Sequence, residues 1–291
     1  MSLSMPLPSH IVPIFSGGGT RLPAHLGILQ ALDEMNIKFN TLVGVSGGSV
    51  ITALYSKGYA IEDMLKLAIS TDFKQFTAFS LWRLVREGGL SSGDHFEQWM
   101  DDLLEGVTFT ELPFALNILA TDVNGGGPVL FNKARTPTVR VSQAVRFSMS
   151  IPLIFSFKEF ENQLLVDGAI LSEDALFEDW QQDGTPSVCF RLKSNAKRRP
   201  LTPRRGFVLP QYISLLIQTF MTAVSREYVH AQYWHNTLVV NTGDISAVDF
   251  SMTEAAKRRL FDVGYQTTLR FLPAKLTRCI KLKRPESHLI E

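Results

Sequence analysis

Short apolar runs alternate with stretches of helical spacing in the first part of the chain. Ile11–Phe15 predicts a buried strand, and a helix follows to about Met35. Asn40–Val43 predicts the next strand, and Val50–Lys57 predicts a helix that Gly58 ends. Strand, helix, strand and helix in this order favour a parallel sheet covered by helices on both faces. The first helix is expected to place four residues on one face: Leu22, Leu26, Leu29 and Leu32.

Proline and glycine positions refine this pattern. Pro13 lies inside the first strand and lacks an N–H group, which indicates an irregular or edge position for that strand. Ser251 and Glu254 have the spacing of a capping box at the start of the last helix. No internal repeat or clear linker divides the chain, so we expect a single domain over residues 10–285. The remaining expected elements are Ile61–Ile69, Val139–Ser148, Gln211–His230 and Ser251–Leu272 as helices, with Phe114–Ala120, Val129–Phe131, Phe157–Phe160, Leu164–Val166, Ser187–Leu192 and Thr237–Val240 as strands.

Two glycine-rich loops follow the first two strands. Gly44-Val45-Ser46-Gly47-Gly48 fits a nucleophile elbow, in which a serine between glycines is exposed at a sharp strand-to-helix turn. Gly17-Gly18-Gly19 can turn backbone N–H groups toward an anion, as in an oxyanion hole, and Arg21 adds a positive charge. Active sites of parallel sheets lie at the carboxyl ends of the strands, so both loops can face one pocket.

Each loop has simpler interpretations. The elbow pattern also fits a plain glycine-rich turn or a phosphate-binding nest, and Arg21 could be a solvated residue beside a tight turn. A dinucleotide site is disfavoured because the G-x-G-x-x-G spacing is not met, and neither loop is followed by a Walker lysine.

Ser46 would need a general base. Asp122 and Asp167 both follow apolar strands, although Asp122 is more typical of a turn and Asp167-Gly168 is a common turn pair. A Ser-Asp-His order would require His230, His235 or His288, and neither His230 nor His235 lies in an obvious strand-end loop. His25 falls inside the first helix, where packing is expected. The residues alone leave the base open.

Composition narrows the function classes. The 291 residues are 45% hydrophobic with a net charge of +1, so no global field attracts nucleic acid. Cys189 and Cys279 fit neither a metal site nor a disulfide framework, and we find no ligand cluster for a metal. With no secretory signal and no apolar run of membrane-spanning length, we expect a cytoplasmic protein that can contact membranes peripherally.

Two further segments suit a lipid surface. Lys193–Arg205 is rich in basic residues, as in a solvated loop or a loop that meets anionic headgroups. Thr71–Leu90 is irregular and aromatic, which fits either a core-covering segment or a lid or rim in contact with lipid. The aromatic and apolar residues of that segment include Phe73, Phe76, Phe79, Leu81 and Trp82.

The motifs together resemble the patatin-like phospholipase family of the bacterial type. Gly17–Arg21 followed by Ala24–Gly27 is similar to the oxyanion-hole block of the family, Gly44–Gly48 to its nucleophile block, and Asp167–Ala169 to its Asp-Gly-Gly/Ala block. Two segments between the second and third blocks, Ala120–Phe131 and Ser150–Pro152, also resemble segments of the family. The resemblance runs from about residue 11 to residue 183. Two departures are Leu22-Pro23 in place of a glycine and Glu173-Asp174-Ala175 in place of Asn-x-Pro.

The resemblance implies a three-layer αβα sandwich with a central, mostly parallel sheet, and a Ser-Asp dyad that needs no metal or cofactor. Ser46 would be the nucleophile, Asp167 the base, and Gly44 and Gly48 the flanks of the elbow. Backbone amides around Gly17, Gly18 and Gly19 would form the oxyanion hole, and Arg21 would support that loop.

The implied activity is hydrolysis of phospholipid or other lipid esters, of the phospholipase A or lysophospholipase type. An acyltransferase or thioesterase using the same acyl-serine, and a non-catalytic lipid-binding module, are the alternatives. The lipid headgroup, the sn position and the acyl length do not follow from the sequence.

Overall fold

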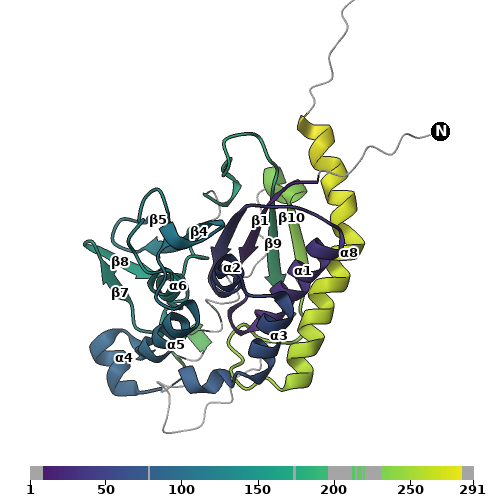
Figure 1. Cartoon of the computed structure of the whole chain (residues 1–291). Coiled ribbons are helices and arrows are strands. Elements are labelled where there is room, and N and C mark those ends of the chain that lie inside the picture. The colour runs from purple at the N-terminus through teal and green to yellow at the C-terminus, as the bar shows by residue number, and fades with distance from the viewer. Residues whose placement is uncertain are drawn as a thin grey trace, which may run out of the picture.

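The structure is a computed structural model that describes residues 9–77, 79–172, 175–195, 212–213, 215–217, 219 and 231–283. Its centre is a mixed sheet of eight strands in the described ranges, in the order β10-β9-β1-β2-β4-β8-β7, with β5 also paired to β4 (Figure 1). The strands β10, β9, β1, β2 and β4 are parallel, and β8, β7 and β5 are antiparallel. The bounds are β1 Val12–Ser16, β2 Thr41–Val45, β4 Ala115–Asp122, β5 Gly127–Asn132, β7 Lys158–Phe160, β8 Gln163–Val166, β9 Ser187–Lys193 and β10 Thr237–Asn241.

Helices and loops cover both faces of this sheet, which makes a three-layer α/β fold. Alternate strand residues point to opposite faces, so Phe15 joins the large core beneath the helices while Ile14 joins a smaller core on the other face. The smaller core is closed by residues near Leu176. The helices of the described ranges are α1 Pro23–Glu34, α2 Gly47–Lys57, α3 Ile61–Ser70, α4 Leu81–Glu87, α5 Asp94–Leu104, α6 Val141–Ser148 and α8 Glu254–Lys283.

Short elements complete the fold. The strands β3 (Gly89–Ser91) and β6 (Leu153–Phe155) form a separate parallel pair. The 3-10 helices are η1 Gly19–Arg21, η2 Phe73–Phe76, η3 Phe109–Glu111, η4 Ala175–Phe177 and η5 Ala231–Asn236.

None of the helices in the described ranges combines the length and the hydropathy that crossing a bilayer requires.

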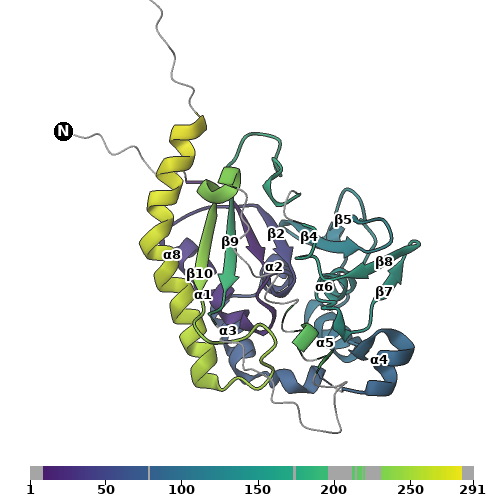
Figure 2. The same ribbon diagram turned by 180° about the vertical axis from the view of Figure 1, so that it is seen from behind.

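The long helix α8 lies along α1 on one side of the molecule (Figure 2). Two glycines let the helices approach: a Cβ on Gly27 would lie 2.0 Å from the Phe261 carbonyl oxygen, and a Cβ on Gly264 would lie 2.0 Å from the Ala24 carbonyl oxygen. Because α1 begins directly after the first glycine loop, this contact anchors the helix on which that loop ends.

The structure corrects the expected position of the first strand. β1 lies inside the sheet, between β9 and β2, and is not an edge strand. The Val12 N–H donates to the Pro186 carbonyl on the β9 side, so by alternation the missing donor of Pro13 faces β2. The register of β1 with β2 starts only at Ile14, and the proline therefore removes no bond from that ladder.

The last helix also differs from the prediction. α8 runs through Pro273 to Lys283 instead of ending at Leu272, and Leu272 and Leu276 are both fully buried on either side of the proline. Packing of these two leucines offsets the hydrogen bond that proline removes. The side chain that caps the start is Thr253, whose hydroxyl accepts the Ala256 N–H, so the capping-box prediction for Ser251 is wrong.

Other predicted helices and strands are present in the structure, but they begin or end at different residues. The helix after Ser46 begins at Gly47, three residues before the predicted start, and Gly58 ends it in the left-handed conformation. The hairpin is confirmed, with Glu161 and Asn162 at positive φ between paired Phe160 and Gln163. Most of the predicted helix 211–230 and the basic segment from residue 196 onward lie outside the described residues, as do Glu173 and Asp174.

Candidate active site

A sharp turn places Ser46 between β2 and α2. Its φ of 53° and ψ of −130° are a strained combination for a residue with a side chain. The flanking residues must be glycine because strand and helix almost touch. A Cβ on Gly48 would lie 2.0 Å from the Phe15 carbonyl oxygen, and a Cβ on Gly44 would lie 2.1 Å from the Thr52 hydroxyl. The local geometry is that of a nucleophile elbow.

The hairpin strand β8 ends next to this serine. The Ser46 hydroxyl donates to Oδ2 of Asp167 at 2.7 Å, across 121 residues of sequence. The other carboxylate oxygen, Oδ1, accepts the Ala169 N–H at 2.9 Å. The sequence left the partner of Ser46 open, and the fold brings Asp167 to it.

Burial makes this aspartate a stronger base than a free one. Asp167 is 3% exposed, and loss of water raises the pKa of its carboxyl from 3.8 to about 6. The hydrogen bonds from Ser46 and Ala169 favour the ionised form and lower the pKa, but they do not cancel the effect of burial. The carboxyl is thus ionised at neutral pH and still able to accept a proton.

The end of α6 holds the backbone of both residues. The Ser46 N–H donates to the Ser148 hydroxyl at 2.8 Å, and that hydroxyl donates to the Leu119 carbonyl at 2.6 Å. The Asp167 N–H donates to the Ser150 carbonyl at 2.9 Å. No pattern in the sequence marked Ser148. For Ser150 the signal was the similarity of Ser150–Pro152 to a family segment.

The first glycine loop lies directly against the elbow. A Cβ on Gly47 would lie 2.8 Å from the Gly19 nitrogen and 2.6 Å from its carbonyl oxygen. The Gly17 N–H is already used, since it donates to the Val45 carbonyl at 3.0 Å. The N–H groups of Gly18 and Gly19 have no acceptor among the residues that the structure describes. The Gly47 N–H in the first turn of α2 likewise has no acceptor in the part of the chain that the structure describes.

Arg21 is a buried part of the loop, and the alternative of a solvated arginine is wrong. Its guanidinium donates to the Gly18 carbonyl at 3.2 Å, the Thr242 hydroxyl at 2.9 Å and the Leu192 carbonyl at 3.3 Å. Burial lowers the pKa of Arg21 to about 10, which leaves it charged at neutral pH. It ties the glycine loop to the ends of β9 and β10.

The histidines do not supply a base where the structure describes them. His25 is fully buried, its Nε2–H donates to the Gly17 carbonyl at 3.0 Å, and its ring packs edge-on against Phe15. Burial lowers the pKa of His25 to about 4, so it is neutral at pH 7. His235 precedes β10 and therefore lies at the amino ends of the parallel strands, away from Ser46. His230 and His288 lie outside the described residues.

Asp122 has a structural role. Its carboxylate accepts the N–H groups of Asn124 and Gly125, both at 2.9 Å, and that of Leu164 at 3.0 Å. These bonds close the turn after β4 and attach it to β8, as expected for an aspartate at a strand end.

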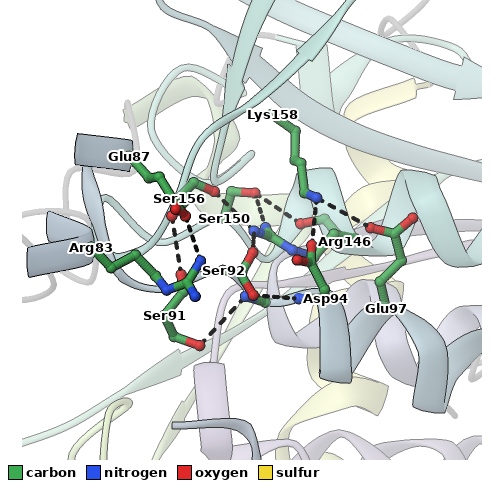
Figure 3. Close-up of polar contacts among 11 residues, drawn as sticks. Arg83, Glu87, Ser91, Ser92, Asp94, Glu97, Arg146, Ser150, Ser156 and Lys158 are labelled. Atoms are coloured by element: carbon green, nitrogen blue, oxygen red, sulfur yellow. Dashed lines mark hydrogen bonds and ion pairs between the residues drawn. The ribbon is translucent and has the colours of Figure 1, made fainter. Parts of the chain in front are cut away.

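A buried arginine supports the segment that holds Asp167. Arg146, on α6, is fully buried and donates to the Ser150 hydroxyl and to the carbonyls of Ser92 and Ser156 (Figure 3). Burial lowers its pKa to about 10, while the nearby carboxylates of Asp94 and Glu97 raise it. Arg146 thus fixes the chain that follows Ser148 to the start of α5.

Comparison with known proteins identifies the group to which this site belongs. The family model of the patatin-like phospholipases matches residues 14–177, more than half of the chain, and spans both glycine loops, Ser46 and Asp167. The chain belongs to the patatin-like phospholipase family. The predicted family is therefore confirmed.

Proteins of bacterial and viral origin are similar to this chain in sequence. The uncharacterized protein YqhO of Bacillus subtilis is 28% identical over an alignment of 292 positions, gaps included, which covers 90% of this chain and 98% of YqhO. A probable lipid hydrolase, 463L of invertebrate iridescent virus 6, is 27% identical over 54% of this chain and 59% of its own length.

Solved structures share the patatin-like fold. VipD from Legionella pneumophila has a TM-score of 0.68 at 16% identity, over 92% of this chain and 67% of VipD. The type III effector protein ExoU of Pseudomonas aeruginosa has a TM-score of 0.53 at 17% identity, over 94% of this chain and 53% of ExoU. The three-layer fold is thus confirmed, and the family name supports hydrolysis of lipid esters.

Proposed function

We propose that this protein is a serine acyl hydrolase of the phospholipase A or lysophospholipase type, with Ser46 as nucleophile and Asp167 as base. One observation carries the proposal: the Ser46 hydroxyl donates at 2.7 Å to a buried carboxylate whose pKa is raised to about 6. A base with a pKa near the working pH combines ionisation with useful basicity. We also propose that residues 10–285 form one catalytic domain.

In the acylation step, Ser46 Oγ attacks the carbonyl carbon of the ester and Asp167 takes the hydroxyl proton. The tetrahedral oxyanion accepts hydrogen bonds from the amides of Gly18, Gly19 and Gly47, each worth about 3–4 kcal/mol in such a site. As the intermediate collapses, the proton on Asp167 passes to the oxygen of the leaving alcohol. The products of this step are the lysolipid, or the deacylated headgroup, and an acyl-serine.

In the deacylation step, Asp167 takes a proton from water, and the water oxygen attacks the acyl-serine carbonyl. Collapse returns the proton to Ser46 Oγ and releases the fatty acid. Every proton movement in this cycle uses the Ser46–Asp167 pair, so a histidine is not required.

We infer the substrate class from the family. A lipid ester with a long acyl chain is presented at a membrane or micelle, which implies peripheral contact with a lipid surface. An acyl-serine can also pass its acyl group to an alcohol or thiol instead of water, so acyl transfer is the competing outcome of the same chemistry.

A matched pair of serine variants tests the proposal. Ser46→Ala removes the nucleophile, and Ser56→Ala removes a buried hydroxyl on the following helix α2, which has no hydrogen-bond partner among the described residues. Fluorophosphonate labelling and mass spectrometry of products from mixed phospholipid vesicles provide the readouts. We expect the wild type and Ser56→Ala to be labelled and to release fatty acid, and Ser46→Ala to do neither.

Two results would contradict the proposal. Fatty acid release by Ser46→Ala at the wild-type rate would exclude this serine as the nucleophile. Transfer of the acyl group to an added alcohol or thiol, with little free fatty acid, would instead assign the protein as an acyltransferase.

A further inference from the structure

One helix near the site exposes an unusually apolar face. α4 has no buried residue, and the side chains of Trp82 and Val85 are 72% and 80% exposed. Leu81 is 47% exposed, and Phe79, just before the helix, is 54% exposed. Residues 81, 82 and 85 share one face because positions three and four apart are neighbours on a helix. We call Phe79, Leu81, Trp82 and Val85 the α4 face.

The α4 face is the outer side of a small, separate core. Leu84 points inward and packs with Leu90 against a cluster that contains Ile151, Ile154 and Phe155. The aromatic segment therefore has two roles, since Phe73 and Phe76 are buried in the main core while the residues of the α4 face remain outside. The core-covering interpretation of Thr71–Leu90 therefore holds for Phe73 and Phe76, and contact with lipid stays a prediction for the exposed part of the segment.

The charges on α4 suit an anionic surface. Arg83 pairs with Glu87, while the guanidinium of Arg86 has no acidic partner within the described residues. Arg86 lies four residues after Trp82, so it borders the exposed indole. Tryptophan is favoured at membrane interfaces, where its ring meets the acyl boundary and its N–H meets the headgroups. An arginine beside it can bind lipid phosphate.

The α4 face lies at the end of the molecule that holds the site. In both ribbon views α4 sits at the lower end, toward which the parallel strand β9 runs (Figures 1 and 2). After α4 the chain enters β3, which pairs with β6, and β6 follows Ser148 and Ser150 almost directly. Arg146 bonds to Ser92 and Ser156, the two residues that directly follow β3 and β6 (Figure 3). The face is thus fixed relative to the dyad.

We propose that the α4 face is the surface by which this protein docks on a phospholipid bilayer. The apolar side chains of the α4 face enter the boundary between headgroups and acyl chains, and Arg86 binds a lipid phosphate. This inference rests on the proposed lipid ester hydrolysis and names the surface through which the substrate is met.

A double variant and a matched control test the docking. Trp82→Ser with Val85→Ser removes the two most exposed side chains of the α4 face, and Phe271→Ser removes a 49% exposed ring on α8. α8 lies on the opposite side of the molecule from α4 (Figure 1). Sedimentation with vesicles measures the affinity for lipid. Hydrolysis of a soluble short-chain ester shows whether the catalytic site is intact.

We expect the double variant to lose affinity for vesicles by on the order of a hundredfold, since two large apolar groups no longer leave water. Its kcat/KM on the soluble ester should stay within about twofold of the wild type, as it should for Phe271→Ser. Arg86→Gln should lose about fivefold in affinity on vesicles of phosphatidylcholine with phosphatidylglycerol, and little on phosphatidylcholine alone.

Wild-type sedimentation of the double variant would overturn the docking proposal while leaving the hydrolysis proposal intact. Equal losses on vesicles and on the soluble ester would show that α4 supports the fold instead of docking. If the wild type hydrolyses neither substrate, the hydrolysis proposal fails, and sedimentation still decides whether the α4 face binds lipid.

Discussion

The two strand–loop–helix units that meet at the site use glycine for different reasons. In the first loop the backbone itself requires it, because Gly17, Gly18 and Gly19 have φ values of 72°, 109° and 53°. Of these three, only Gly19 would also bring a Cβ to 2.1 Å from a backbone oxygen, that of Ala247. In the second loop the glycines have ordinary φ values, but Gly48 has no room for a Cβ. There the positive φ falls on Ser46. Two copies of one local pattern thus present different groups, free amides from the first loop and a hydroxyl from the second.

The comparison also separates what each loop depends on. The amide loop is held by buried side chains that do not face the reaction, Arg21 and His25. The serine loop depends on Asp167, which reaches it from another part of the chain. Four changes probe this division.

The largest expected effect is that of Gly48→Ala. The added methyl would lie 2.0 Å from the Phe15 carbonyl oxygen, a backbone atom that cannot move away cheaply. We expect a loss of about 3–5 kcal/mol in the free energy of unfolding, with little soluble protein. Gly17→Ala is the matched control, because nothing lies within 4 Å of its Cβ and only its positive φ is strained. Gly17→Ala should lose about 1 kcal/mol in the free energy of unfolding. Equal losses for both variants in denaturant titrations would show that the two loops do not need glycine for different reasons.

Asp167→Asn should abolish activity and stabilise the fold. Loss of the base lowers the rate by about a thousandfold or more on a soluble ester. At pH 8 the buried carboxylate is charged, and its pKa of about 6 against 3.8 when unfolded corresponds to a cost on the order of 3 kcal/mol that the amide avoids. The gain in the free energy of unfolding should be complete above about pH 6, where the folded wild type carries the charge. It should be absent below about pH 3.8, where the carboxyl is protonated in both states. Thermal unfolding at both pH extremes measures it, and a variant less stable than the wild type at pH 8 would show that burial of the charge is not what destabilises the fold.

Arg21→Lys should slow catalysis through the first loop alone. Lysine keeps the charge, but it cannot make all three bonds of the guanidinium to Gly18, Thr242 and Leu192. We expect kcat to fall by about thirtyfold with little change in KM, since the amides are misplaced only for the transition state. The midpoint of the pH profile should stay near 6, because the base is untouched. A shifted midpoint would mean that Arg21 acts on Asp167.

The pH profile gives the smallest effect. Because the pKa of Asp167 is raised to about 6, the ionised base is lost as the pH falls through that value. The rate on a soluble ester should fall about tenfold between pH 7 and pH 5, and it should be flat from pH 7 to pH 8. His25 contributes nothing in this range, since its pKa is about 4. A midpoint near pH 4 would show that Asp167 is solvated during turnover.

The sequence was sufficient to predict the two glycine loops, but it did not show which residue pairs with Ser46. Runs of glycine after apolar strands are local signals, so the two strand–loop–helix units were predictable from neighbouring residues. The partner of Ser46 was not, because Asp167-Gly168 reads equally well as a turn, and only the family resemblance favoured it. The contact forms through the pairing of β8 with β4, which no local pattern specifies.

The roles of residues that support the site and the fold could not be predicted from the sequence for the same reason. Ser148 looks like an ordinary helical serine, yet its hydroxyl bridges Ser46 and Leu119. Pro273 signals the end of a helix, but the burial of Leu272 and Leu276 against the rest of the fold outweighs that local preference. Tertiary packing decided each of these positions.

The separation of the dyad along the chain has a consequence for protein synthesis. Ser46 emerges from the ribosome early, directly after the parallel strands β1 and β2, whereas Asp167 comes 121 residues later with an antiparallel hairpin. Domains fold as units once enough of the chain is available. The nascent chain therefore carries Ser46 without its proposed base while the next 121 residues are translated, and the proposed pair is assembled only when the hairpin docks. For the proposed lipid ester hydrolase, this order delays activity until the hairpin has docked.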